Sequence, residues 1–199
     1  MSKTIDYYMS VSSPWSYLGH ERFVALAKEH SAQVNVYVVD LAKVFPVSGG
    51  LPLPKRAPQR QAYRMFELKR WKAHLGIAFN PVPKFFPVKG DPAARMVIAA
   101  LPQGSERALA LAGAYMRAAW AEERDVGDAD TLKQIAAAQG FDADKLLTAS
   151  NSPATQQRYD EFTQQAVDRQ VFGAPWYVYN GEPFWGQDRL SFLKSALGK

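Results

Sequence analysis

Ser12-Ser13-Pro14-Trp15-Ser16-Tyr17 is the stretch that decides the fold. It follows the apolar run 5–9 and opens an amphipathic pattern, which predicts a strand, a tight turn and the start of a helix. Ser13 is a suitable N-cap, and Pro14 falls in the first turn, where its missing N–H would have been unpaired anyway. The next N–H groups, from Trp15 onward, would face a group that approaches the helix tip, and such a tip favours an anion.

The same turn resembles a redox motif without its sulfur. A strand that enters a helix through Cys-X-X-Cys is typical of thioredoxin-like proteins, and here the frame reads Ser13-Pro14-Trp15-Ser16. The sequence contains no cysteine, which excludes disulfide exchange and thiolate nucleophiles on the protein itself. Any thiol chemistry would therefore need a thiol from another molecule.

The composition predicts a globular protein and argues against a nucleic-acid partner. The 199 residues are 47% hydrophobic, which is ample for a buried core. The net charge of +5 is scattered without long runs of like charge, which argues against a nucleic-acid partner and suits small carboxylate ligands. Asp6 interrupts what would be the apolar part of a signal peptide, and no apolar stretch is long enough to span a membrane. We therefore expect a soluble cytoplasmic protein with no membrane partner.

The order of predicted elements is β-α-β, an all-helical middle, and β-β-α. Strands are predicted at 4–9, 33–39, 174–179 and 182–185, and helices at 14–30, 59–74, 92–100, 105–124, 130–139, 142–149, 153–170 and 187–197. Residues 45–58 are rich in Pro and Gly and should form an irregular loop. This order indicates an α/β fold in which a discontinuous thioredoxin-like domain, residues 1–45 and 171–199, receives an insertion of a loop plus a helical domain at 46–170.

Other chemical motifs are absent from the sequence. His20, His30 and His74 are far apart and lack carboxylates at ligand spacing, so we expect no metal site. Neither a nucleophile elbow nor a phosphate-binding loop is present. Several aromatic residues could belong to the core or could line a pocket for a flat aromatic ligand: Trp71, Phe85, Phe86, Tyr115 and Trp120.

Four groups of residues carry a family resemblance. They are SPWSYL at 13–18, PQRQAY at 58–63, NPVP at 80–83 with FP at 86–87, and VFGAP at 171–175 with FWGQDRL at 184–190. Together they resemble the 2-hydroxychromene-2-carboxylate isomerase family, which is related to the kappa-class glutathione transferases and built on the DsbA-like thioredoxin fold. The resemblance implies a homodimeric, glutathione-dependent isomerase of an aromatic carboxylate catabolite, which acts by reversible thiolate addition, bond rotation and elimination.

The resemblance also assigns the residues around the glutathione sulfur. Ser13, beside Pro14, would donate a hydrogen bond to the thiolate, and Pro175 would be a cis-proline that exposes the backbone of Ala174 to the cysteinyl part of glutathione. A helix terminus and a charge-assisted hydrogen bond both lower a thiol pKa, so this role is physically sound. Taken alone, Ser13 could be only an N-cap, while Ser12 and Ser16 fit as residues of the turn.

The ends of glutathione are assigned in the same way. Gln187, Asp188 and Arg189 match the segment that holds the γ-glutamyl end, with Asp188 near the α-ammonium and Arg189 near the carboxylate. Arg60 falls where the family often has a cation near the glycyl carboxylate or the substrate. Alternatively, Asp188 is an N-cap, and Arg189 and Arg60 are solvent-exposed arginines.

Two positions depart from the family pattern. Ser10 stands where an Asp is common, and Leu51 stands where an Asn is common near the substrate. Two other functions remain open beside the isomerase. One is a kappa-like transferase that conjugates glutathione to electrophiles, and the other is a thioredoxin-like binding protein without catalytic activity.

Overall fold

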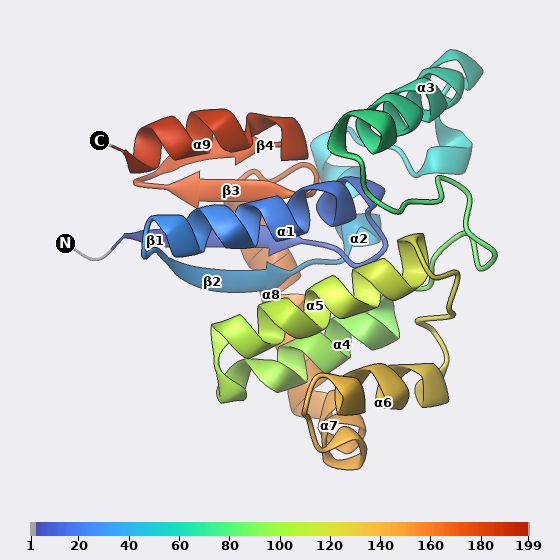
Figure 1. The fold of residues 1–199 in the computed structure, drawn as a ribbon, viewed down its shortest axis with the longest axis vertical. Coiled ribbons are helices and arrows are strands. Elements are labelled where there is room, and N and C mark those ends of the chain that lie inside the picture. The colour runs from blue at the N-terminus through green and yellow to red at the C-terminus, as the bar shows by residue number, and fades with distance from the viewer. Residues whose placement is uncertain (1–2, 199) are drawn as a thin grey trace.

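A four-stranded sheet in the order β2-β1-β3-β4 forms the centre of the computed structural model, which describes residues 3–198. The strands are β1 (Thr4–Met9), β2 (Gln33–Val38), β3 (Trp176–Tyr179) and β4 (Glu182–Trp185). β1 pairs with β2 in parallel and with β3 in antiparallel orientation, and β3 pairs with β4 in antiparallel orientation. The carboxyl ends of β1, β2 and β4 and the amino end of β3 therefore lie at one edge of the sheet (Figure 1).

Helices cover both faces of the sheet and extend below it (Figure 1). They are α1 (Pro14–Glu29), α2 (Leu41–Ser48), α3 (Pro58–Leu75), α4 (Asp91–Ala100), α5 (Ser105–Trp120), α6 (Ala129–Ala138), α7 (Ala143–Ser150), α8 (Pro153–Asp168) and α9 (Leu190–Leu197). Three short 3₁₀ turns, Leu53–Lys55, Leu101–Gln103 and Gln187–Arg189, complete the regular structure of the described residues.

Alternating side chains of β1 explain why both faces are covered. Tyr7 is fully buried on one face, where its ring lies 4.4 Å from that of Phe23 in α1. Tyr8, on the opposite face, is equally buried in a second cluster with Ala166 of α8. Helices therefore cover both faces of β1, which lies between β2 and β3 in the sheet.

Most of the predicted elements are confirmed within a few residues. The turn at Asn180-Gly181 is confirmed too, because both residues have positive φ, 50° and 80°, as a two-residue hairpin requires. The thioredoxin-like order with helices inserted between the strands is therefore confirmed, whereas the domain boundaries stay a prediction. Among the described residues, none of the helices has the length and apolar character needed to cross a bilayer.

The prediction of an irregular loop over 45–58 was partly wrong. α2 continues to Ser48 because the Asp40 side chain caps its start and Gly49 ends it in the left-handed conformation. Pro46 is tolerated because its missing N–H removes only the helical bond that would reach Ala42.

Three element boundaries also differ from the prediction. α5 ends at Trp120 instead of residue 124, because the backbone N–H groups of Glu122 and Arg124 turn back to carbonyls of the last helical turn. β3 begins at Trp176 instead of residue 174, since Pro175 has no N–H for strand pairing. The closing helix is split into the 3₁₀ turn at Gln187–Arg189 followed by α9.

His20 joins the sheet, α1 and the inserted helices. Its ring is 2% exposed, with Nε2 at 2.9 Å from the Leu109 carbonyl of α5 and Nδ1 at 3.2 Å from the Tyr7 hydroxyl. The carbonyl can only accept, so Nε2 carries the proton and Nδ1 accepts from Tyr7. Burial lowers the pKa of His20 below its ordinary value. His20 is therefore a neutral core residue.

This burial predicts a pH dependence of stability. Because the folded pKa of His20 lies below the unfolded value of about 6.5, the free energy of unfolding should fall as pH drops below that value. The slope should approach about 1.4 kcal/mol per pH unit within the window between the two pKa values. Urea unfolding of the wild type and of His20→Gln between pH 7.5 and about 5 measures it. The variant should lose this slope, and equal slopes for both proteins would contradict the assignment.

Candidate active site

Ser13 lies at the tip of α1, where β1 ends. Its side chain is 5% exposed, and its Oγ accepts the Ser16 N–H at 3.2 Å, which confirms the predicted N-cap. The same oxygen donates its proton to the carbonyl of Ala174, also at 3.2 Å. A hydroxyl can accept and donate at once, so the cap leaves the Ser13 proton available for another acceptor.

The remaining N–H groups of the first turn are largely occupied. The Tyr17 N–H bonds to the Ser13 carbonyl, Ser16 is capped, and Pro14 has no N–H. Trp15 has the one backbone N–H at this tip without an acceptor among the described residues. A ligand at the tip therefore meets two donors, the Trp15 N–H and the Ser13 hydroxyl.

The segment before β3 reaches the same tip. Ala174 is buried, and its bond to Pro175 is cis, as predicted. The Pro175 carbonyl accepts the Gly186 N–H at 3.0 Å, so this segment is tied to the start of the C-terminal 3₁₀ turn. Three predicted site residues, Ser13, Ala174 and Pro175, are thus brought together from opposite ends of the chain.

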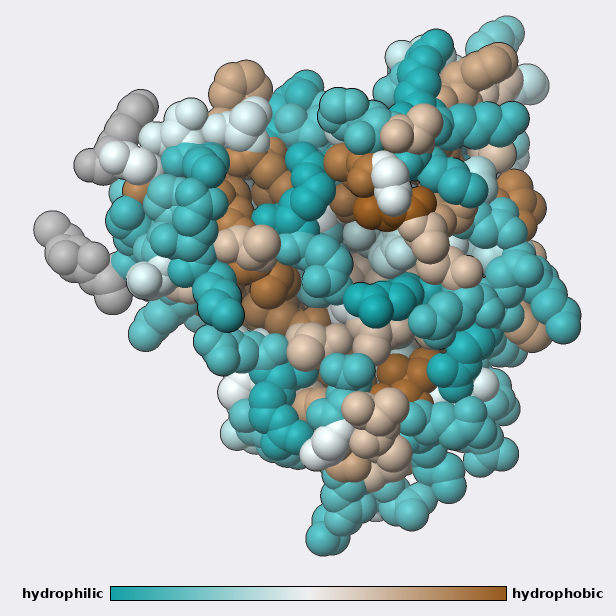
Figure 2. All heavy atoms as spheres, viewed as in Figure 1, coloured by the Kyte–Doolittle hydropathy of each residue, from teal (hydrophilic) through white to brown (hydrophobic). Residues whose placement is uncertain are grey.

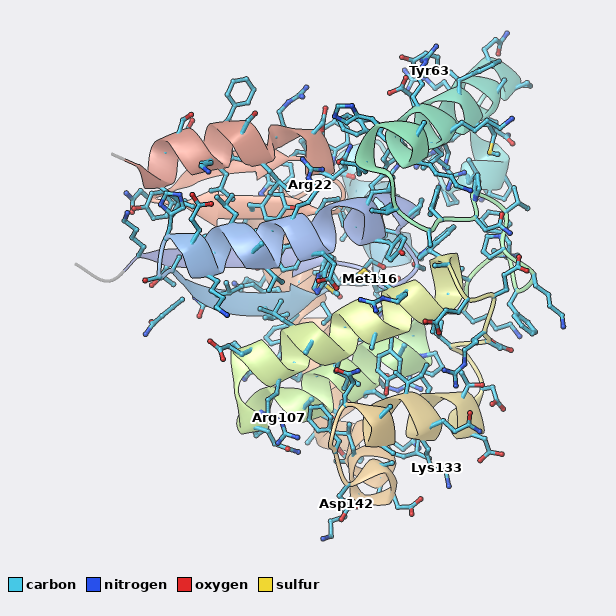
Figure 3. The ribbon with its side chains drawn as sticks, viewed as in Figure 1. Arg22, Tyr63, Arg107, Met116, Lys133 and Asp142 are labelled. Atoms are coloured by element: carbon cyan, nitrogen blue, oxygen red, sulfur yellow. The ribbon has the colours of Figure 1, made fainter. Side chains whose placement is uncertain are left out.

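Gln187 is held next to α1. Its side chain is 2% exposed, and its Oε1 accepts from the Arg22 guanidinium at 2.7 Å; Figure 3 shows Arg22 on α1, on the side toward α9. A Cβ added at Gly19 would lie 2.7 Å from the Cβ of Gln187. The absence of a side chain at Gly19 therefore allows the 3₁₀ turn to approach α1 closely.

Asp188 and Arg189 lie farther out. They form an ion pair with each other at 2.6 Å, with side-chain exposures of 37% and 49%. The alternative of Asp188 as the cap of α9 is wrong, because Arg189 occupies that cap position without a side-chain bond. Arg189 also lines a shallow surface hollow together with Trp185 and Phe192. Asp188 and Arg189 could bind the α-ammonium and the carboxylate of a γ-glutamyl group only if their mutual ion pair broke.

No hydrogen bond or ion pair among residues 3–198 joins the Arg60 side chain to the Ser13 turn. It is exposed on α3, as is Leu51 in the preceding loop. Its neighbour is Arg56, whose guanidinium donates to the Leu51 carbonyl at 2.7 Å and whose pKa is lowered by burial and by the charge of Arg60. The structure thus places Arg60 in a positively charged surface with no carboxylate partner among residues 3–198.

An aromatic cluster flanks the turn. The indole of Trp120 is 1% exposed and donates to the Val11 carbonyl at 3.2 Å, while Phe79 contacts both Trp120 and Tyr17. Phe86 packs against Trp120 but remains 37% exposed. In the same region Figure 2 shows a hydrophobic patch between α1 and α3 on an otherwise mainly hydrophilic face. Tyr115 and Trp120 are therefore core residues, whereas Phe86 also reaches the surface.

A cavity next to the turn was not predicted. It is lined by Ser10, Ser12, Lys89 and Arg95 among others. The two serines belong to the predicted turn or directly precede it. Nothing in the sequence around Lys89 or Arg95 indicates that these two residues lie close to that turn. Within residues 3–198, no group of His, Asp and Glu residues is arranged to hold a metal ion.

Comparison with known proteins supports the thioredoxin-like fold. The sequence pattern of the DSBA-like thioredoxin domain matches residues 4–198. The chain is 32% identical to a 2-hydroxychromene-2-carboxylate isomerase of Sphingobium xenophagum, over 99% of each protein. It is 26% identical to glutathione S-transferase kappa 1 of Caenorhabditis elegans, over 97% of this chain and 90% of that protein.

The fold agrees with a solved relative as well. The structure of a 2-hydroxychromene-2-carboxylate isomerase superposes with a TM-score of 0.86 at 27% identity, covering 98% of this chain and 94% of that one. The resemblance found in the sequence motifs therefore extends along the whole chain.

The contact of Gly19 with Gln187 can be tested by substitution. Gly19→Ala would gain helix propensity, but its Cβ would overlap the Gln187 side chain, so we expect a net destabilisation of about 1–3 kcal/mol. Urea unfolding monitored by circular dichroism measures the change. Gly198→Ala is the control, because its new Cβ would meet no atom closer than 3.6 Å. A Gly19→Ala protein as stable as the control would refute the close approach.

Proposed function

Because the chain belongs to the 2-hydroxychromene-2-carboxylate isomerase family of DsbA-like thioredoxin proteins, we propose that it is a glutathione-dependent isomerase of an aromatic carboxylate. The relatives at 31–32% identity bear the isomerase name, and the sequence has no thiol of its own. The proposed reaction resembles the conversion of 2-hydroxychromene-2-carboxylate to trans-o-hydroxybenzylidenepyruvate. The homodimer stays a prediction.

The observation that carries this proposal is the position of the Ser13 hydroxyl. It lies at the positive end of α1, 3.2 Å from the carbonyl of Ala174, with the free N–H of Trp15 beside it. These groups suit a sulfur anion better than a neutral thiol, because both are donors and the helix end favours negative charge. The residues present therefore fit glutathione bound with its sulfur at the tip.

Different residues of the chain would bind different parts of glutathione. The Ala174 carbonyl would accept the cysteinyl N–H, which frees the Ser13 hydroxyl to donate to the sulfur. The 3₁₀ turn at Gln187–Arg189 would meet the γ-glutamyl end, with Asp188 and Arg189 exchanging their mutual ion pair for the charged ends of the ligand. Arg60, on the positively charged surface of α3, would bind the glycyl carboxylate.

Bound glutathione supplies a thiolate that adds reversibly to an activated carbon, so that a double bond becomes single, can rotate, and re-forms on elimination. The protein's part is to stabilise the anion and to orient the second substrate. The partly exposed side chain of Phe86 packs against Trp120, whose indole donates to the Val11 carbonyl, and it would offer an apolar surface near the turn for an aromatic ring.

Two other functions make different predictions for glutathione. A kappa-like transferase, which the similarity to glutathione S-transferase kappa 1 favours, would consume one glutathione per product. An isomerase returns glutathione unchanged, so its concentration stays constant through many turnovers. A binding protein without catalysis would bind glutathione or a similar ligand without forming product.

Ser13→Ala is expected to lower isomerase kcat/KM about 10- to 100-fold at neutral pH. A hydrogen bond to a charged group is worth about 1.5–3 kcal/mol, so its loss should raise the pKa of the bound thiol by about one to two units. The defect should therefore shrink as pH rises toward the thiol's free value of about 8.5. Steady-state rates at saturating glutathione between pH 6 and about 9 measure this shift.

Ser16→Ala serves as the matched control. It removes a hydroxyl from the same turn, one that only accepts a long 3.4 Å bond from the Ser10 N–H, so the pH profile should stay that of the wild type. Thermal unfolding of both variants separates the loss of the cap from the loss of catalysis. Full turnover by Ser13→Ala at pH 6.5 would refute the assigned role, and proportional consumption of glutathione would favour the transferase.

A further inference from the structure

The cavity behind the β1–α1 turn has the size of a ligand subsite. Its volume is about 480 Å³, and it lies between the turn, the starts of α2 and α4, and the side of α8. Small-molecule sites usually measure a few hundred Å³ or more. A Cβ added at Gly90 would lie 3.0 Å from the Cβ and the backbone N of Ser12, so α4 begins directly against the turn that carries Ser13. Ser12, which lines the cavity, directly precedes Ser13, the proposed contact of the sulfur.

The two carboxylates of the cavity already have partners. Asp40 accepts the Ala42 N–H at 2.8 Å as the cap of α2. Asp91 accepts the Tyr159 hydroxyl at 3.0 Å and lies in the first turn of α4. Each negative charge is next to a helix start, which stabilises it. Neither carboxylate therefore needs the nearby cations for compensation.

The two cations of the cavity, in contrast, lack partners. Among residues 3–198, no hydrogen bond or ion pair involves the side chain of Lys89 or of Arg95, although both line the cavity. Arg95 is half-buried, and its guanidinium has five N–H donors in a planar fork that suits a carboxylate. Because a partly buried charge without a partner is costly, Arg95 in particular is available to an anion in the cavity.

The serine pair adds a neutral donor. The Oγ atoms of Ser10 and Ser12 are 3.0 Å apart, so one hydroxyl donates to the other and the second keeps its own proton for a further bond. Both residues line the cavity. A carboxylate at position 10 would instead add a third negative charge and repel an anion.

We propose that this cavity binds the carboxylate of the second substrate, with Arg95 and Lys89 as charged donors and the Ser10–Ser12 pair as a neutral donor. The inference rests on the proposed function, because it sets the carboxylate end of an aromatic acid next to the carbon that a thiolate held by Ser13 would attack. It also provides polar recognition of the substrate although Leu51 is apolar.

Two probes of the same shape test the charge requirement, cinnamate and its neutral amide, cinnamamide. Their affinities are measured by isothermal titration calorimetry in the absence of glutathione. The wild type should bind cinnamate about tenfold more tightly than cinnamamide, as a charge-assisted hydrogen bond provides. Arg95→Gln should remove most of this preference, and Lys89→Gln should reduce it. Because Lys89 is exposed, the second variant keeps the test valid if the first does not fold.

Arg107→Gln is the matched control for the loss of one positive charge. Arg107 is exposed on α5, in the turn farthest from Trp120, and Figure 3 shows it at the end of the helix away from the α1 tip. Its substitution should leave the cinnamate preference unchanged. A wild type without the preference, or a preference that survives in both cavity variants, overturns the subsite. If the preference behaves as expected while glutathione itself does not bind, the subsite stands and the proposed function fails.

Discussion

The pairing of β1 with a parallel neighbour on one side and an antiparallel neighbour on the other is the constraint on which the site depends. Parallel pairing puts the end of β2, and with it Asp40, beside the end of β1. Antiparallel pairing puts Ala174 and Pro175 there as well, and the hairpin returns Gly186 to the same edge. Loops from both ends of the chain thus meet at the tip of α1 because of sheet register alone.

The chemistry of this edge follows from the residues that replace the two cysteines of a redox frame. A hydroxyl at Ser13 cannot exchange disulfides, but it caps the helix and still has a proton to donate. The energetic role of the tip, to favour an anion, is independent of which molecule supplies the sulfur. On the proposed function, the helix tip keeps its preference for an anion and the thiol comes from glutathione.

The inserted helices contribute charge as well as packing. α5 is fixed to α1 through His20 and to the turn through Trp120, so the start of α4 lies against Ser12. Asp40 and Asp91, near that contact, are each stabilised by a helix start, while no hydrogen bond or ion pair among residues 3–198 involves the side chain of Lys89 or of Arg95. Lys89 and Arg95 are therefore available to an anionic ligand next to the Ser13 turn.

The sequence by itself determined the order and type of most elements and the N-cap at Ser13, because periodicity and turn residues are local properties. Its motifs indicated the family, and the resemblance to that family implied the cis bond before Pro175. It did not show that a helix capped by Asp40 and Gly49 continues through Pro46, since Pro and Gly residues in this segment predict an irregular loop. Only the tertiary structure decided that Gly19 admits Gln187, that Asp188 pairs with Arg189, and that Arg95 lines a cavity with Ser10 and Ser12. The physical reason is that a pattern records whether a side chain is buried, whereas its partners are set by the packing of segments far apart in the chain.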